Sequence, residues 1–413
     1  MVAVDRLRNR VAGLDVHRDV VVGCVRAVAG GERTVAKQKF KTTSAGLAEL
    51  AGWLLDQQVE LVVMEATGVY WKAPYYAVEG AVAELWLVNA RHVKNVPGRK
   101  TDLSDAEWLA DVAAHGMVRP SLVPPPPIRE LRELTRYRKT QVDARAKEIQ
   151  RLEKVLQDAG IKLTSVASTV YSKSSVAMVE AMIAGERNPE VLAGLARGRM
   201  RARIPALSQA LAGRFAAHHG VVARRILDHI TFLDASIAQL SAEIAARCVP
   251  FAEALDLLIS IPGISRLTAE VIIAETGGDM SRFPSAAHLA AWAGVAPANA
   301  ESAGKRHAAG SRHGPQWLRR ALAESAKAAS HGKDTYLAAQ YRRIARRRGP
   351  NKATVAVAHS IVVAAWHVLT SGEPYSDPGG DYFERRESSD ARARRLVRQL
   401  EALGHQVTLT PAA

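Results

Sequence analysis

Residues 59–66 read VELVVMEA, an apolar run that ends beside a carboxylate, Glu65. A continuous run of this length is typical of a central strand that is buried on both faces. A second apolar segment, VAGLDV at 11–16, also carries an acidic residue near its end, Asp15. Taken alone, Asp15 is simply explained as a hydrogen-bonding residue at a strand end. A carboxylate among apolar neighbours is nonetheless costly unless it is paired or binds a cation.

Further elements surround these two strands. Ser44 can cap a helix, and another helix is expected from about Tyr70. Three strands, a helix, a strand, a helix, a strand and a helix is the order found in ribonuclease H-like nucleases. This order predicts an α/β domain of the RuvC/ribonuclease H-like class in residues 1–123. The remaining expected strands are 19–28, 33–40 and 83–89, and a last helix is expected from Asp102 to His115.

Four consecutive prolines, Pro124 to Pro127, favour an extended spacer and mark the first domain boundary. Two long helices with heptad-like apolar positions are expected beyond them, at about 128–159 and 224–246. The pair suggests either an antiparallel coiled coil, which could form a dimer contact, or a bundle within one chain. We therefore divide the rest of the chain into a proline linker with coiled-coil helices (124–250), a mostly helical domain (251–371) and a polar, basic tail expected to be partly disordered (372–413).

Composition narrows the class of partner. The chain has 413 residues, 48% of them hydrophobic, and a formal net charge of +15, which points to a polyanion. Arginines cluster at 197–203 and 342–348, although a solvated basic surface would look the same. The two cysteines, Cys24 and Cys248, exclude a disulfide framework or a cysteine-rich zinc site and fit a reducing cytoplasm. We see no secretory signal, and no apolar run that we judge long enough to span a membrane.

Two further carboxylates, Asp102 and Asp105, are three residues apart and would share one face of a helix. Each could instead cap that helix or favour its dipole. Together with Asp15 and Glu65 they can converge on one point. Carboxylate oxygens are hard ligands that suit Mg²⁺, for which Mn²⁺ can substitute. The four acids therefore predict a metal site of the kind that stabilises phosphoryl transfer.

The segment LLISIPGISRLTAEVIIAETGG (257–278) has the form of a helix-hairpin-helix. Pro262, Gly263 and Ile264 would make the tight turn between the helices. Such a hairpin directs backbone N–H groups toward a phosphate and contacts DNA without reading its sequence. An ordinary helical hairpin with a Pro-Gly turn is the alternative.

Residues 297–314 are small, polar and basic, which predicts an exposed loop. This loop contains Ser302 close to Lys305 and Arg306. A serine among glycines and cations is suited to attack a phosphodiester, because the backbone can approach closely and the cations hold the phosphate. On local grounds alone Ser302 is an ordinary loop serine, and Ser311 and Ser265 compete with it.

These segments resemble one family. GLDVHRD (13–19), VVMEATGVYW (62–71) and RKTDLSDAEWLA (99–110) are similar to the N-terminal, RuvC-like domain of the DEDD transposases of the insertion-sequence one-ten family, which includes the pilin-gene invertases. The stretch 292–322, which contains ESAGK, is similar to the C-terminal serine transposase domain of that family. The resemblance spans roughly 1–120 and 250–370. The middle helices resemble the family only in being long helices with heptad-like apolar positions, and the tail beyond about Gly372 shows no resemblance.

The resemblance implies that Asp15, Glu65, Asp102 and Asp105 are metal ligands and that Ser302 is a nucleophile forming a covalent phosphoserine link to DNA. It further implies a homo-oligomer, a dimer or tetramer, in which domains of different protomers combine. A structured bridge RNA would guide the choice of donor and target DNA in the bacterial cytoplasm, with the protein at the nucleoid when active. A RuvC-like nuclease without serine chemistry and a non-catalytic binder stay open as alternatives. The residues that we expect to contact nucleic acid are Lys100, Pro262, Gly263, Ile264, Lys305, Arg306 and Arg312.

Overall fold

The structure is a computed structural model. It describes residues 8–94, 96, 104–297, 301–302, 305–306, 310, 313–385 and 389–410. The chain divides into two compact units, Met1–Val123 and Pro124–Ala413, and each unit is described by itself.

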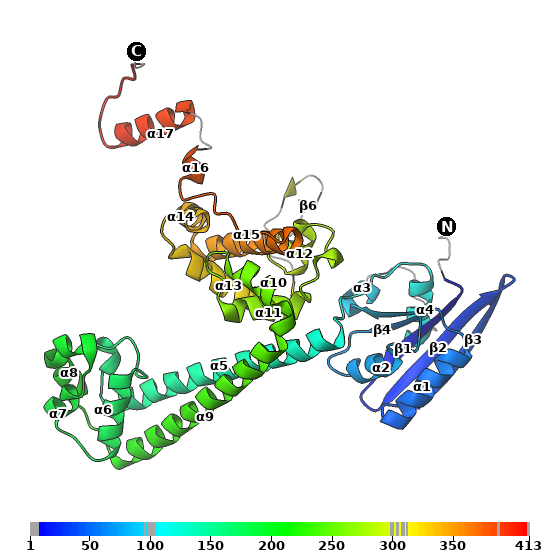
Figure 1. Cartoon of the computed structure of the whole chain (residues 1–413), viewed down its shortest axis with the longest axis horizontal. Helices are drawn as coiled ribbons and strands as arrows, with labels where there is room; N and C mark the ends of the chain where they lie inside the picture. The colour runs from blue at the N-terminus through cyan, green and yellow to red at the C-terminus, as the bar shows by residue number, and fades with distance from the viewer. Residues whose placement is uncertain are drawn as a thin grey trace. The chain divides into compact units, whose positions relative to one another are not determined.

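The first unit is built on a five-stranded mixed sheet, so the expected N-terminal α/β sheet is confirmed (Figure 1). Its strand order is β3-β2-β1-β4-β5. β1 is antiparallel to β2 and parallel to β4, which is in turn parallel to β5. The strands are β1 (Arg10–Val16), β2 (Val20–Ala29), β3 (Glu32–Lys41), β4 (Leu61–Glu65) and β5 (Glu84–Val88).

Helices cover both faces of this sheet. Leu14 and Met64 face one core, which also contains residues of α1 (Ser44–Asp56) and α2 (Lys72–Val78). Val11 and Val63 face the other core, formed with α3 (Ala90–Lys94) and α4 (Asp105–Ala114). Because side chains alternate along a strand, neighbouring residues of β1 and β4 serve different cores.

Two helix starts differ from the expected ones. The side chain of Thr43, not Ser44, caps α1 by accepting a hydrogen bond from the backbone N–H of Gly46. Ser104 caps α4 by accepting a hydrogen bond from the N–H of Glu107, so the cap is Ser104 and the first helical residue is Asp105. Asp102 lies outside the described residues.

The backbone of α4 touches β1 at Gly13. A Cβ atom at this position would lie 1.9 Å from the carbonyl oxygen of Ala106 and 2.7 Å from the backbone nitrogen of Ala110. No side chain fits there without moving one of the two backbones. Gly13 thus sets the distance at which the first turns of α4 pack on the centre of the sheet.

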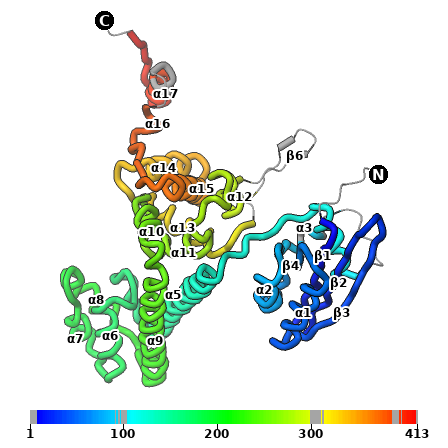
Figure 2. The backbone as a smooth tube through the Cα atoms, turned by 45° about the vertical axis from the view of Figure 1, so that its right-hand side comes forward, coloured from blue at the N-terminus to red at the C-terminus, as the bar shows by residue number. Residues whose placement is uncertain are grey.

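The second unit begins with two long helices, α5 (Pro126–Asp158) and α9 (Ala217–Arg247), which pack against each other within the chain (Figure 2). The four prolines were expected to form an extended spacer, but Pro126 and Pro127 start α5. Proline is tolerated in the first turn because the N–H groups there have no helical partner. A small helical core that we had not expected closes the far end of the pair. It contains η1 (Leu163–Ser165), α6 (Lys173–Ile183), α7 (Pro189–Gly194), η2 (Gly198–Arg203) and α8 (Ile204–Leu211).

The C-terminal part of this unit is mostly helical. By length and composition α15 (Pro350–Ser371) could cross a membrane, although no such run was expected. Its buried residues, such as Val357 and Ile361, pack against α12, α13 and α14, as those of a core helix do. The elements are η3 (Val249–Phe251), α10 (Ala252–Ile259), α11 (Arg266–Thr276), η4 (Met280–Arg282), α12 (Ala286–Trp292), β6 (Glu301–Ser302), β7 (Lys305–Arg306), α13 (Gln316–Ser330), α14 (Tyr336–Arg348) and α15 (Pro350–Ser371).

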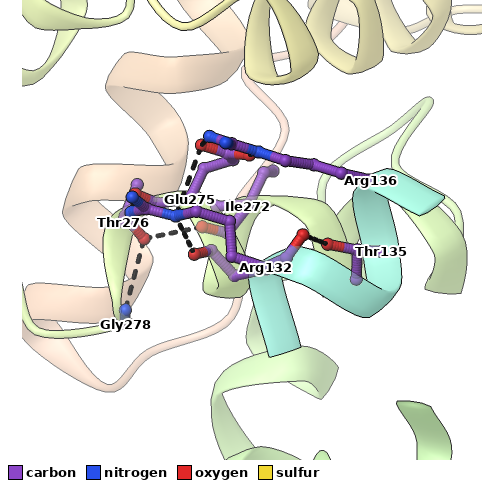
Figure 3. A network of polar contacts seen from close by, with 8 residues as sticks. Arg132, Thr135, Arg136, Ile272, Glu275, Thr276 and Gly278 are labelled. Carbon is purple, nitrogen blue, oxygen red and sulfur yellow. Dashed lines mark hydrogen bonds and ion pairs between the residues drawn. The ribbon is translucent and has the colours of Figure 1, made fainter. Parts of the chain in front are cut away.

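Buried ion pairs fasten α5 to α11 (Figure 3). The carboxylate of Glu275 is 1% exposed and accepts two hydrogen bonds from the guanidinium of Arg136, at 2.7 and 2.8 Å. Arg132 donates to the backbone carbonyl groups of Ala274 and Glu275. One turn earlier on α11, Glu270 pairs with Arg138 of α5 at 2.8 Å. Bidentate, charge-assisted pairs of this kind are geometrically specific, so they fix the register of the two helices.

The tail contains more structure than its polar composition suggested. It includes α16 (Tyr382–Arg385) and α17 (Ser389–Ala402). The backbone N–H of Tyr375 donates to Ser260, and the ring of Phe383 stacks on that of Tyr336. Aromatic residues within a polar segment thus attach 373–385 to the helical domain.

We predict that Gly13→Ala destabilises the first unit by about 2 kcal/mol or more, because the new methyl group overlaps the backbone of α4. Gly52→Ala is the matched control, since Gly52 lies within α1 and a Cβ atom there would have no neighbour within 4 Å. This change should stabilise the helix by about 0.5–1 kcal/mol. Urea unfolding followed by tryptophan fluorescence measures both effects. Equal midpoints for the two variants would contradict the close approach.

Candidate functional site

Asp15 and Glu65 lie at the same edge of the sheet. Leu14 of β1 is paired with Met64 of β4, so the next residues along these parallel strands are Asp15 and Glu65. Side chains alternate between the two faces along a strand, and Val11 of β1 and Val63 of β4 face α4. Asp15 and Glu65 lie an even number of residues further along the same strands, so they face the same side. The two carboxylates therefore lie on the α4 side of the sheet, at the C-terminal ends of neighbouring strands. The side chain of Asp15 is 27% exposed, so solvent reaches it.

Ion pairs define the direction of α4 across the sheet. Glu107 pairs with Lys37 of β3. Lys37 is opposite Cys24 of β2, which is in turn opposite Gly13 of β1, so this ion pair lies at the height of Gly13 on the sheet. One turn later, Asp111 pairs with Arg26, which is opposite Val11. The helix thus runs antiparallel to β1. Its first residue, Asp105, is exposed and lies toward the end of β1 that carries Asp15.

These acids are near one another but not tightly clustered. Among the described residues, one group brings three potential ligand atoms within 4.8 Å of one another, and it consists of Asp158, His218 and His219. Like charges repel, so ionised carboxylates that lie close together are stabilised by a cation between them. The structure therefore brings Asp15, Glu65 and Asp105 to one edge without closing a coordination sphere.

The Asp158, His218 and His219 cluster has a structural explanation. Nδ1 of His219 accepts a hydrogen bond from the backbone N–H of Ala216 at 3.0 Å, which caps α9. Nε2 of the same ring is then protonated and donates to Asp158, also at 3.0 Å. This hydrogen bond lowers the pKa of the Asp158 carboxyl. Because both nitrogens of His219 are occupied, the cluster is a poor ligand set.

Sequence reasoning missed His17. Its Nε2 lies 3.1 Å from a carboxylate oxygen of Asp15. The signal was present in the sequence, because His17 follows Asp15 by two residues and so lies on the same side of the extended chain. The contact orients the Asp15 carboxylate.

The donor set fits a hard divalent cation. Asp15, Glu65 and Asp105 offer carboxylate oxygens, the ligands that Mg²⁺ and Mn²⁺ prefer. The two cysteines do not enter into this chemistry. Both are buried, and burial raises the pKa of the Cys24 thiol to about 11 and also raises that of Cys248. Neither is a thiolate at neutral pH, as a nucleophile would need to be.

The backbone of Ser302 belongs to a short two-stranded ladder, in which β6 pairs with β7 and Ser302 is opposite Lys305. The side chains of Ser302, Lys305 and Arg306 lie outside the described structure, as do Lys100 and Arg312 entirely. A Cβ on Gly314 would lie 2.5 Å from the carbonyl group of Ala293, so the two ends of the loop meet.

The predicted turn of the hairpin lies between α10 and α11. Gly263 has a positive φ of 92°, and a Cβ there would lie 2.4 Å from the carbonyl oxygen of Ser325 on α13. The side chain of Ile264 is buried, while Pro262 is half-buried. Gly263 thus serves the packing against α13, and any phosphate contact by these residues would be made by the backbone. Ser265 caps α11.

Comparison with known families matches both ends of the chain. Residues 12–161 match the DEDD transposase family of the IS110 type, described as a transposase. Residues 255–342 match a family described as "Transposase IS116/IS110/IS902 family". Together the two matches cover more than half of the sequence.

Individual proteins are similar over most of the chain. The transposase for insertion sequence element IS1111A of Coxiella burnetii is 26% identical over 383 residues, which is 89% of this chain and 91% of that protein. The insertion element IS900 uncharacterized 42 kDa protein of Mycobacterium paratuberculosis is 27% identical over 321 residues, 72% of each chain. A putative transposase, y4pF/y4sB, of Sinorhizobium fredii is 30% identical over 128 residues, 30% of this chain and 33% of that protein.

We predict that Mg²⁺ or Mn²⁺ raises the thermal unfolding midpoint of the protein and that Asp15→Asn abolishes most of this rise. A ligand at a hundred times its Kd stabilises the folded state by about 2.7 kcal/mol, and loss of a charged ligand weakens that binding. Asp158→Asn is the matched control, because it removes one carboxylate from the histidine cluster. If Asp15→Asn keeps the full rise in unfolding midpoint and Asp158→Asn loses it, the ion binds at the histidine cluster and the assignment to Asp15 is contradicted.

Proposed function

This chain belongs to the IS116/IS110/IS902 family of insertion-sequence transposases, and we propose that it joins DNA through a metal-dependent transesterification with Ser302 as the nucleophile. The observation that carries the proposal is the common edge of β1 and β4. There, Asp15 and Glu65 face the side of the sheet on which α4 begins at Asp105.

We assign the first unit to the RuvC/ribonuclease H-like fold. Its strand order, with β1 central and flanked by an antiparallel and a parallel neighbour, supports this assignment. We also propose that α10 and α11 form a helix-hairpin-helix and that α5 and α9 form a coiled coil.

Asp15, Glu65, Asp102 and Asp105 would hold the divalent ion. When bound, such an ion supplies positive charge to the attacked phosphate and to its leaving oxygen. His17 would keep the Asp15 carboxylate in place through the contact at 3.1 Å. Neutralising any one carboxylate should lower affinity for the ion rather than affinity for DNA.

Ser302 would attack the phosphorus of a phosphodiester through its Oγ. A bond forms between Oγ and phosphorus, the bond from phosphorus to one deoxyribose oxygen breaks, and that oxygen leaves as a hydroxyl group. The proton lost by Ser302 passes to a carboxylate, and the leaving oxygen takes up a proton. One phosphoester replaces another, so rejoining needs no ATP. Lys305 and Arg306, next to Ser302 in the ladder, would bind the phosphate.

We further propose that the carboxylates and Ser302 of different protomers form one site in a dimer or tetramer. The turn of Pro262, Gly263 and Ile264, through the backbone N–H of Gly263, and the side chains of Lys100 and Arg312 would hold DNA near it. The protein would work in the bacterial cytoplasm.

A suicide DNA substrate, nicked so that the leaving strand diffuses away, tests the serine chemistry. The protein should form a covalent adduct that migrates with the DNA on denaturing gels, and Ser302→Ala should lower adduct formation by at least about a thousandfold. Asp15→Asn should also lose the adduct but retain DNA binding, because it affects the ion rather than the phosphate contacts. Ser311→Ala and Ser265→Ala are the matched serine controls and should retain the adduct.

Two outcomes would contradict the assignment. Cleavage without an adduct, unchanged in Ser302→Ala, indicates a RuvC-like nuclease without serine chemistry. Binding without cleavage, unchanged in Asp15→Asn, indicates a non-catalytic binder.

We also propose that a structured RNA guides the choice of DNA. The excess of cations suits a partner recognised through its backbone, with sequence read by base pairing. RNA purified with the protein from its host should be one discrete species whose loops pair with the DNA flanking the gene. A heterogeneous population that mirrors total cellular RNA would refute guidance.

A further inference from the structure

Five arginines project from the end of α14 without partners that neutralise them. Within the described residues, each is exposed and none forms an ion pair. The helix itself contains no acidic residue. We call this set the α14 arginine surface, and it consists of Arg342, Arg343, Arg346, Arg347 and Arg348.

Folding does not explain this arrangement. Arg342 with Arg346, and Arg343 with Arg347, are one turn apart, and like charges at that spacing destabilise a helix. The C-terminal dipole of α14 offsets part of this cost. Arg136 and Arg138 of α5, by contrast, are neutralised by buried carboxylates. An uncompensated surface of this kind is the usual footprint of a polyanion.

One of the five is held in place by the tail. The guanidinium carbon of Arg343 lies 4.7 Å from the centre of the Phe383 ring. The guanidinium group lies over the ring, and among the described residues no carboxylate pairs with its N–H groups, which can therefore donate to a phosphate. An arginine that is oriented before binding loses less conformational entropy when it meets a phosphate.

The tail in turn is attached to the start of the same helix. The ring of Phe383 stacks on Tyr336, with centroids 5.3 Å apart. A carboxylate oxygen of Asp377 accepts hydrogen bonds from the backbone N–H groups of Tyr336 and Gly379, at 2.9 and 2.8 Å. Figure 1 shows α16 beside α14, in agreement with their contacts. Residues 377–383 therefore form a clamp across the N-terminal turn of α14.

We propose that the α14 arginine surface binds the phosphate backbone of duplex DNA and that Phe383 is a positioning residue for Arg343. The inference rests on the proposed function only in taking DNA as the partner, which the family establishes. It does not depend on the carboxylates or on Ser302. Two rows of arginines, each with members one turn apart, can contact successive phosphates without reading sequence.

The first experiment removes two charges from the surface. Binding of the full-length protein to a 30-base-pair duplex is measured over a range of salt concentrations. Arg346→Gln with Arg347→Gln should weaken binding on the order of tenfold and reduce the slope of log K against log salt by about 1.8, or 0.9 for each lost phosphate contact. The double variant Arg199→Gln with Arg201→Gln is the matched control. Both arginines are exposed on η2, so replacing them removes the same amount of charge from a different part of the surface. Equal effects of the two double variants would overturn the proposal.

The second experiment isolates the clamp. Phe383→Leu retains apolar volume but removes the ring face, and it should weaken binding by about threefold. In an Arg343→Gln background the same change should have no further effect, because the two residues act as a unit. An effect of the same size in both backgrounds would refute the positioning role, provided that both variants melt like the parent.

A third measurement separates the nucleic acids and the proposals. The same duplex made of RNA should be less affected by the α14 changes than the DNA, and an effect confined to RNA would overturn the choice of partner. If Ser302→Ala still forms the adduct while the α14 variants lose DNA affinity, the serine assignment fails and the DNA surface stands.

Discussion

The contact on which the candidate site depends is that between the backbone of α4 and Gly13 of β1. No side chain separates the two elements, so the helix lies on the sheet at the smallest distance that backbones allow. Ion pairs at Glu107 and Asp111 then fix the direction of the helix. Asp105 reaches the edge that carries Asp15 and Glu65 only because both conditions are met. Close packing thus sets the position of the candidate carboxylates.

Arginine has opposite roles in different parts of the second unit. On α5, Arg136 and Arg138 are paired with nearly buried carboxylates of α11, and the pairs fix how the helices meet. Removing one partner from such a pair leaves a charge without compensation, which is strongly destabilising. On α14, the same residue type is exposed and without ion pairs among the described residues. Net charge alone does not distinguish these two roles. They differ in whether a carboxylate of the same chain pairs with the arginine.

The sequence predicted the elements that have strong local signals. The apolar run ending at Glu65 became the buried β4, and the heptad-like positions became α5 and α9. It did not predict α6 to α8, because short helices in a small core have no long period to detect. The attachment of residues 373–385 to the helical domain was not predicted, because it depends on a few aromatic residues within a polar segment. Gly13 and His17 were overlooked because their importance comes from contacts formed in the folded sheet. The proposed roles of Asp102 and Ser302 rest on family resemblance and stay predictions.

The meeting of Gly314 with Ala293 has a consequence for how this protein can change over evolutionary time. Since the chain leaves and re-enters the helical core at one point, residues can be added to or deleted from the intervening segment without altering the spacing of α12 and α13. The segment between Ala293 and Gly314 can therefore vary in length while the helical scaffold is retained.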